Sequence, residues 1–321
     1  MTQQRYIWLD SAKGISILSV MVCHAGGFVF YTEDTFVIKV IDSFFMSLFF
    51  LCSGFVSLKL FTSSGDRKYG VVLKDFSLLI PFIIFGLTYA YCLTGDVTVS
   101  GLLSKLFSDW SLGYWFLFTL FIFRISSILA AKATSAFKSG KYKWTVVLLS
   151  IIIVLTLGHY TNKWGFTVAY FPFFLLGALI KKYDLHTLLK RSMWVCPSMG
   201  IIAVIGFTIY HYSEYNIHPY VYIFGIRFFM TLTIFMGFVN SGGNTTLAKI
   251  GNYSLEIYCL HYFFMIGCKN ILFPKDFLLQ FPWAIQMLFM FVVATILTIL
   301  SIVSAKCIKA IPNLHKILFG R

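Results

Sequence analysis

The sequence predicts an all-helical polytopic membrane protein with about ten transmembrane helices and both termini in the cytoplasm. Of its 321 residues, 59% are hydrophobic and only 12% are charged, and the mean hydropathy is +0.82. A soluble protein of this size does not normally carry so many apolar residues. The apolar residues form continuous runs, whereas the strands of a membrane barrel would alternate apolar and polar positions. We therefore predict a single membrane domain over residues 1–321.

Ten apolar runs are long enough to cross a hydrocarbon layer roughly 30 Å thick as helices. In chain order these runs cover residues 13–31, 38–60, 72–93, 113–131, 144–158, 164–181, 193–211, 221–240, 252–272 and 279–309. The fifth run is the shortest of the ten. The longest outer connection, over residues 94–112, is too short to form a separate domain.

The basic residues between the runs support this count and predict the orientation. With the N-terminus in the cytoplasm, nineteen of the 26 lysines and arginines fall in inner segments and five in outer segments. Such an excess on the inner side is typical of membrane proteins and places both termini in the cytoplasm. The other two, Arg124 and Arg227, lie within apolar runs, as do Asp42 and Glu256. These four residues could form ion pairs that fix helix packing or could belong to a polar site.

Charge and cysteine content exclude several other classes of protein. The formal charge is +14, but the lysines lie between apolar runs instead of clustering on a polar surface, as nucleic-acid binding would require. The seven cysteines occur singly, without Cys-x-x-Cys spacing, so they predict neither a disulfide framework nor a metal site. We predict no metal and no bound cofactor, and we expect no cleavable signal peptide.

The first run contains two ionisable residues at helical spacing, Lys13 and His24. Eleven residues make about three turns plus roughly 20°, so the two side chains share one stripe of a helix, about 16 Å apart. With Lys13 at the water interface, His24 lies near the middle of the membrane, where an ionisable group indicates function by default. Burial disfavours the imidazolium, so we expect a neutral ring that can act as a general base. The alternative is a structural histidine that donates to a neighbouring helix.

A second histidine lies at a matching depth in the ninth run. Ser254, Tyr258 and His261 follow the i, i+4, i+7 spacing and share one face of a helix. This helix starts on the inner side, so His261 lies about 15 Å from the cytoplasmic edge. Two histidines at equal depth predict one polar cavity that both rings share.

Four motifs resemble, in their order along the chain, those of the acyltransferase-3 family of bacterial membrane acyltransferases, in particular its short branch of fucose O-acetylase-like and enterobacterial common antigen O-acetyltransferases. The motifs are Lys13 with His24, Leu48–Phe55, Trp115–Leu117 and Ser254–His261, with Trp8–Asp10 ahead of the first. The resemblance covers nearly the whole chain. Lys13 stands where arginine is usual, which keeps the charge but loses the bidentate geometry toward phosphate. Ser47 stands where proline is common.

The resemblance implies an enzyme of the cell (inner) membrane that transfers an acetyl group from acetyl-CoA to a hydroxyl of a cell-surface carbohydrate or its lipid-linked precursor. His24 would act as the base. His261, Ser53 and Tyr258 would steady the oxyanion or orient that base. The anionic donor would enter from the cytoplasm past Asp10 and bind cationic side chains, namely Lys13, Arg67, Lys68 and Lys74. The last three could equally be ordinary inner-side charge. The acceptor would contact Tyr114, Trp115 and Arg124.

Two alternatives remain open at the level of sequence. A transporter or flippase of a lipid-linked glycan would also place ionisable residues near the membrane midplane. It would, however, call for paired halves with interrupted helices, which the sequence does not show. A covalent route through Cys23 or Cys52 is the second alternative, although burial disfavours the thiolate that such a route needs.

Overall fold

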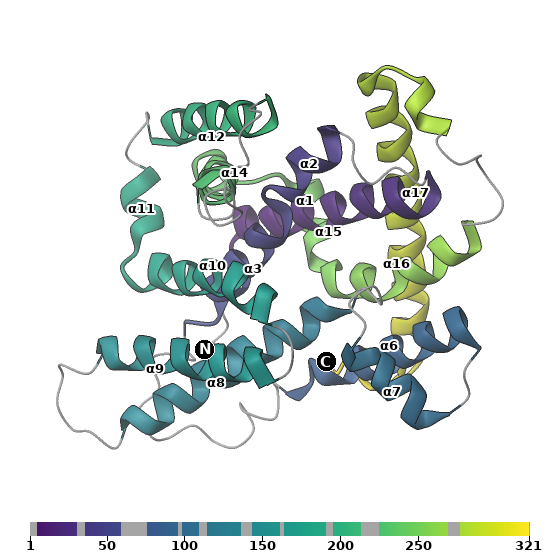
Figure 1. Ribbon diagram of the computed structural model, residues 1–321, viewed down its shortest axis with the longest axis horizontal. Coiled ribbons are helices and arrows are strands. Elements are labelled where there is room, and N and C mark those ends of the chain that lie inside the picture. The colour runs from purple at the N-terminus through teal and green to yellow at the C-terminus, as the bar shows by residue number, and fades with distance from the viewer. Residues whose placement is uncertain are drawn as a thin grey trace. The chain divides into compact units, whose positions relative to one another are not determined.

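A computed structural model describes residues 5–30, 36–58, 76–95, 98–108, 114–135, 143–160, 164–190, 195–212, 225–268 and 277–320, and every regular element in these ranges is a helix (Figure 1). The predicted all-helical fold class is therefore confirmed. The helices form two compact units. The first consists of Met1–Cys52 and Ile180–Ala305, and the second of Ser53–Leu179 and Lys306–Arg321.

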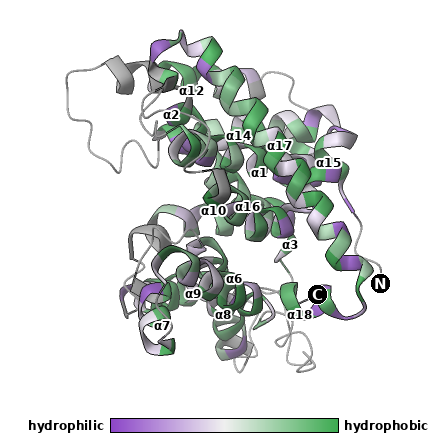
Figure 2. Cartoon of the chain, turned by 90° about the vertical axis from the view of Figure 1, so that its right-hand side faces the viewer, coloured by the Kyte–Doolittle hydropathy of each residue, from purple (hydrophilic) through white to green (hydrophobic). Residues whose placement is uncertain are grey.

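Four stretches of helix are long and apolar enough to cross a membrane: Ile7–Val29, Ile38–Val56, Trp115–Ala133 and Trp283–Ala310. The bent pair Leu79–Thr94 and Val99–Leu106 would make a fifth if it counts as one span. Hydrophobic residues predominate along these helices, as the colouring in Figure 2 shows. The chain is thus an integral membrane protein, while the full set of ten spans and the orientation of the termini stay predictions.

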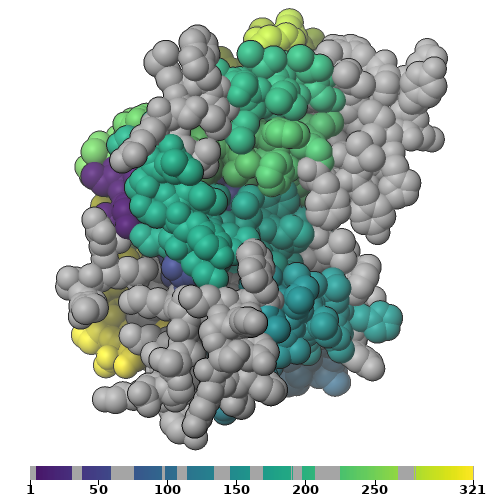
Figure 3. Space-filling view, turned by 90° about the vertical axis from the view of Figure 1, so that its left-hand side faces the viewer, coloured from purple at the N-terminus to yellow at the C-terminus, as the bar shows by residue number. Residues whose placement is uncertain are grey.

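The first unit is built around α1, which packs against α14, α15 and α16. Its helices are α1 (Ile7–His24), the π-helix η1 (Ala25–Val29), α2 (Phe36–Asp42), most of α3 (Phe45–Val56), α11 (Leu185–Lys190), α12 (Val195–Tyr212), α14 (Arg227–Ser241), α15 (Thr245–Asn252), α16 (Ser254–Cys268), the 3-10 turn η5 (Phe277–Gln280) and most of α17 (Trp283–Ala310). Helices α11 and α12 pack against α14, and this teal and green part of the unit reaches the surface in Figure 3.

The second unit contains the end of α3 and the helices α6 (Leu79–Thr94), α7 (Val99–Ser108), α8 (Trp115–Ser135), α9 (Lys143–Tyr160), most of α10 (Trp164–Lys182) and α18 (Leu314–Phe319). A Cβ on Gly54 of α3 would overlap the backbone carbonyl of Phe174 on α10. Gly54 therefore lets α3 and α10 approach each other closely. Phe123 of α8 packs on Phe174 with ring centroids 5.6 Å apart.

Helix ends differ from the predicted runs where tertiary contacts decide them. Helix α1 begins at Ile7, ahead of the predicted 13, so Lys13 lies within the helix and not at its start. A turn at Ser43 and Phe44 divides the second run into α2 and α3. The ninth run begins at Ser254, directly after the separate helix α15, which ends at Asn252. Helix α15 was not predicted because it is short and rich in polar residues.

Small residues let α1 and α15 lie side by side. A Cβ on Gly14 would overlap the carbonyl of Leu247, and a Cβ on Gly251 would overlap the carbonyl of Asp10. Ser11 reinforces this contact, because its hydroxyl lies 2.8 Å from both the backbone nitrogen and the backbone oxygen of Asn244. The side chain of Asn244 in turn accepts from two backbone N–H groups of the first turn of α15. The contact fixes the part of α1 that carries Asp10 and Lys13.

We expect Gly251→Ala to destabilise the protein, because the added methyl group meets backbone atoms that cannot move aside. Overpacking of this kind costs about 1–3 kcal/mol, and the loss should appear as a lower Tm in detergent. Gly237→Ala in α14 is the matched control, because nothing lies within 4 Å of its Cβ position. An unchanged Tm in Gly251→Ala would contradict the close packing of α1 and α15.

Candidate active site

Helix α1 carries the predicted lysine and histidine without a break. The α-helical hydrogen bonding continues from Ile7 to His24, which confirms that Lys13 and His24 share one stripe. The π-helix η1 follows directly, over Ala25–Val29. It brings Phe28 against His24, with ring centroids 5.7 Å apart. Such π-helical turns are rare and frequently occur at functional sites.

The first unit brings the two predicted histidines together. The rings of His24 on α1 and His261 on α16 are stacked, with centroids 5.3 Å apart and an interplanar angle of 29°. His24 is half-buried, whereas His261 is fully buried. The two residues lie 237 positions apart in the sequence, so only the tertiary fold creates this pair. The predicted proximity of the two imidazoles is confirmed.

Each imidazole is fixed by one hydrogen bond. Nε2 of His24 lies 3.0 Å from the hydroxyl of Tyr262, and Nδ1 of His261 lies 3.0 Å from the backbone oxygen of Ile257. The other nitrogen of His261, Nε2, is buried, and the described residues offer it no hydrogen-bond partner. Most buried polar atoms of proteins are hydrogen-bonded, so an exception requires an explanation. Nε2 of His261 can therefore still form a hydrogen bond within the site.

Aromatic side chains enclose the histidine pair. The ring of Tyr258 lies 5.9 Å from that of His261, and the ring of Phe28 lies 5.8 Å from that of Tyr262. Tyr258 is 5% exposed and Tyr262 is 1% exposed. These rings make the surroundings of the pair largely apolar, and polar interactions there are stronger than they would be in water.

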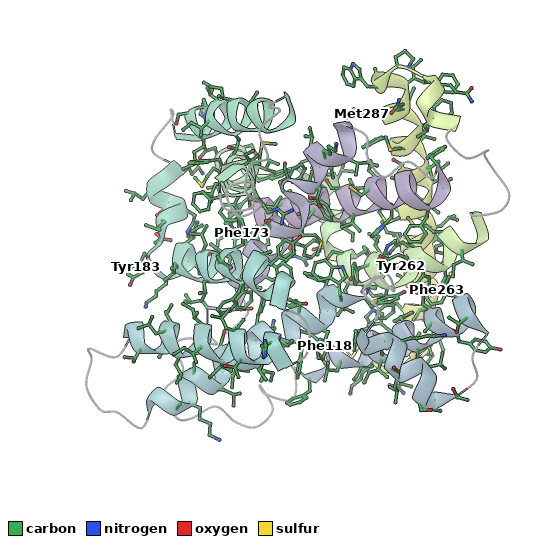
Figure 4. The ribbon with its side chains drawn as sticks, viewed as in Figure 1. Phe118, Phe173, Tyr183, Tyr262, Phe263 and Met287 are labelled. Atoms are coloured by element: carbon green, nitrogen blue, oxygen red, sulfur yellow. The ribbon has the colours of Figure 1, made fainter. Side chains whose placement is uncertain are left out.

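Tyr262, which is labelled in Figure 4 on α16, was not predicted from the sequence. Ser254, Tyr258 and His261 define one face of the helix in the ninth run, and Tyr262 points about 100° away from that face. Its ring nevertheless contacts His261, with centroids 4.0 Å apart, and its hydroxyl reaches His24. Its position next to a predicted site histidine was the only signal in the sequence.

A group of charges surrounds Asp10 on α1. Oδ1 of Asp10 lies 3.4 Å from Nζ of Lys13, and Oδ2 lies 2.8 Å from Nε of Arg5. Arg5 also donates a hydrogen bond to the side chain of Asn252 at the end of α15. One carboxylate therefore faces two cations, which leaves an excess of positive charge. Arg5 was not among the predicted binding residues, because the sequence alone does not bring it to Asp10.

Lys13 remains partly accessible, with 22% of its side chain exposed. A partly exposed ammonium can still bind an anion, because water does not screen it fully and the protein does not fully neutralise it. Three further predicted donor-binding residues, Arg67, Lys68 and Lys74, lie outside the described residues.

Four predicted site residues belong to the second unit. Ser53 is buried in α3 beside Gly54. Tyr114 is only 1% exposed and packs edge-on against Tyr89, with ring centroids 5.9 Å apart. Trp115 is half-buried and stacks on Tyr170, with ring centroids 5.6 Å apart. The fourth residue, Arg124, is half-buried on α8.

Of the two alternatives for the charges within apolar runs, at least one ion pair is observed. Nη2 of Arg227 on α14 lies 3.0 Å from Oδ2 of Asp42 on α2. The arginine side chain is 7% exposed and that of the aspartate 48%. The pair joins two helices of the first unit, so a role in packing accounts for it.

A third histidine lies outside the apolar spans. His186 on α11 packs against Trp8 and Tyr6, with ring centroids 5.8 and 6.1 Å away. Burial lowers the pKa of His186 below its usual value of 6.5, and Lys181 adds to this effect, although Asp184 opposes it. The folded protein therefore favours the neutral ring.

Because the pKa of His186 is lower in the folded state, the unfolded chain binds more protons near pH 6 and stability rises with pH. We expect the Tm in detergent to fall between about pH 7 and about pH 5, and to fall less in His186→Asn, which cannot be protonated. An equal fall in the two proteins would show that His186 does not contribute.

Comparison with known proteins identifies the family. The family described as "Acyltransferase domain", the acyltransferase-3 family, matches residues 6–303, a range that includes the histidine pair, Tyr262 and Asp10. No curated protein and no solved structure matches the chain. Because the match extends over most of the sequence, this chain belongs to the acyltransferase-3 family and is a membrane acyltransferase.

Proposed function

We propose that this protein transfers an acetyl group from acetyl-CoA to a hydroxyl of a cell-surface carbohydrate or of its lipid-linked precursor. Family membership makes the protein an acyltransferase. The proposal adds the donor, the acceptor and the histidine pair as the site of transfer.

The observation that carries this proposal is the stacked pair of imidazoles, His24 and His261, in which Nε2 of the fully buried His261 lacks a hydrogen-bond partner among the described residues. A buried polar atom without a partner costs roughly 1–3 kcal/mol. Function is a reason to keep such an atom, because a neutral imidazole in an apolar site can accept the proton of an attacking hydroxyl.

The charges near Asp10 support an anionic donor. Coenzyme A carries phosphates on one end and the thioester on the other end of a long pantetheine arm. Lys13 would bind a phosphate through its partly exposed ammonium. The stripe of α1 from Lys13 to His24 spans about 16 Å, a distance that an extended pantetheine arm can cover. The thioester would thus reach the histidine pair.

The reaction is a transfer from sulfur to oxygen. The acceptor oxygen forms a bond to the carbonyl carbon while the histidine pair takes the hydroxyl proton, and the carbonyl oxygen becomes a transient oxyanion. The bond from carbon to sulfur then breaks, and the thiolate takes the proton from the imidazolium. Tyr258, whose ring lies 5.9 Å from that of His261, is the further candidate to bind the oxyanion.

The test is to incubate membranes that contain the protein with acetyl-labelled acetyl-CoA and to measure label in the glycan fraction. Label that appears only when the protein is present supports the proposal. Mass spectrometry of the labelled glycan would then identify the sugar and the hydroxyl that carry the acetyl group. The absence of label, together with altered export of glycan, would contradict the proposal and favour a transporter of lipid-linked glycan.

A further inference from the structure

The hydrogen bond of His261 fixes which of its nitrogens can accept a proton. Nδ1 lies 3.0 Å from the backbone oxygen of Ile257, and a carbonyl oxygen can only accept, so Nδ1 carries the hydrogen. A neutral imidazole has one N–H group. Nε2 of His261 therefore carries the lone pair, and this buried atom has no partner among the described residues. His261 is thus held as a proton acceptor.

The hydrogen bond of His24 gives the opposite arrangement. Nε2 of His24 lies 3.0 Å from the hydroxyl of Tyr262. A phenol is a stronger acid than a neutral imidazole, so the favoured arrangement has the O–H of Tyr262 donating to Nε2. The hydrogen of the His24 ring then lies on Nδ1. His24 is thus held as a donor.

We infer that the two histidines divide the reaction between them: His261 takes the proton of the acceptor hydroxyl, and His24, oriented by Tyr262, donates a hydrogen bond from Nδ1 to the carbonyl oxygen of the thioester. This inference rests on the proposed function and reverses the roles expected from the sequence. Its basis is the juxtaposition of one accepting and one donating imidazole, stacked with centroids 5.3 Å apart. Tyr262 is a positioning residue, because it acts through His24.

The atoms and charges of the step balance. The hydroxyl oxygen bonds to the carbonyl carbon, its proton passes to Nε2 of His261, and the negative charge on the carbonyl oxygen is stabilised by the N–H of His24. When the carbonyl bond reforms, the bond from carbon to sulfur breaks. The thiolate then takes the proton from Nε2 of His261, which restores both neutral rings.

Asparagine substitutions distinguish the two roles. The amide of asparagine can imitate an N–H at Nδ1 but cannot act as a base. Transfer of label from acetyl-CoA to the glycan fraction should therefore be at least tenfold faster in His24→Asn than in His24→Ala. His261→Asn can still bond to the Ile257 carbonyl but should be no faster than His261→Ala. The inference is overturned if His24→Asn is as slow as His24→Ala, or if His261→Asn keeps activity well above His261→Ala.

Tyr262→Phe tests the positioning role, because it removes the hydroxyl and keeps the ring. We expect kcat to fall tenfold or more with KM for acetyl-CoA unchanged. In the His24→Asn background the same substitution should have no further effect, since Tyr262 acts through the His24 ring. A merely structural role would give the same fractional loss in both backgrounds, and that result would overturn the assignment of Tyr262.

The wild-type protein separates failure of this inference from failure of the proposed function. If the wild type transfers no label from acetyl-CoA, the proposed function is wrong and the division of roles falls with it. If the wild type transfers label and the asparagine variants show the opposite order, only the division of roles is wrong. Size-exclusion profile and Tm in detergent show for each variant that the protein is folded.

Discussion

Membranes that carry His24→Ala should transfer acyl groups at least about 100-fold more slowly than wild-type membranes, and His261→Ala should have a similar effect. A positioned acid or base contributes typically about 10²–10⁴-fold to a rate, and loss of one donor to an oxyanion costs about 10²–10³-fold. Both substitutions also break the stacked pair. The measurement is the initial rate of label transfer from acetyl-CoA at equal amounts of inserted protein.

The double variant of His24 and His261 should be about as slow as either single variant, because residues that act as one unit lose function together. His159→Ala is the matched control, since this exposed histidine lies in another apolar helix, α9, and its loss should leave the rate unchanged. Near-normal product from His24→Ala would remove the histidine pair from the mechanism.

Lys13→Ala should raise KM for acetyl-CoA by about tenfold or more, because one charge-assisted hydrogen bond to phosphate contributes about 1.5–3 kcal/mol. Lys13→Arg should keep most of the activity, since it retains the positive charge and can still pair with Asp10. The measurement is KM and kcat with acetyl-CoA and with its 3′-dephospho form. If Lys13 contacts that phosphate, the preference for the complete donor should shrink in Lys13→Ala and persist in Lys13→Arg.

Lys249→Ala on α15 controls for a general loss of positive charge. Lys249 is an exposed lysine of the same unit, and its removal should change KM by less than about twofold, because exposed charges are well screened. Equal activity of Lys13→Ala and Lys13→Arg would contradict a role of Lys13 in donor binding.

Composition and helical spacing predicted the class of protein and the positions of most helices. Runs such as 144–158, 164–181 and 279–309 coincide closely with α9, α10 and α17, because a long apolar run in a membrane has to satisfy its backbone within one helix. Helix α15 escaped prediction, since its residues are polar and its helical form depends on the cap at Asn244 and the contact with α1.

The candidate site was predicted in part. Periodicity placed Lys13 and His24 on one stripe, and equal depth suggested that His261 would lie near His24, which the structure confirms. Tyr262 and Arg5 were missed, because a sequence pattern describes one helical face at a time. The contacts of His24 on α1 with Tyr262 on α16, and of Arg5, just ahead of α1, with Asn252 at the end of α15, join residues more than 230 positions apart.

Hydropathy and helical period are local properties that each segment carries alone, so they were enough to predict a membrane protein made of helices. The contact of His261 Nδ1 with the Ile257 carbonyl is local to α16, but tertiary structure alone decided which histidine nitrogen faces a phenol and which has no partner among the described residues. Those contacts set the hydrogen positions on the two rings, and hydrogen positions decide whether an imidazole donates or accepts a proton.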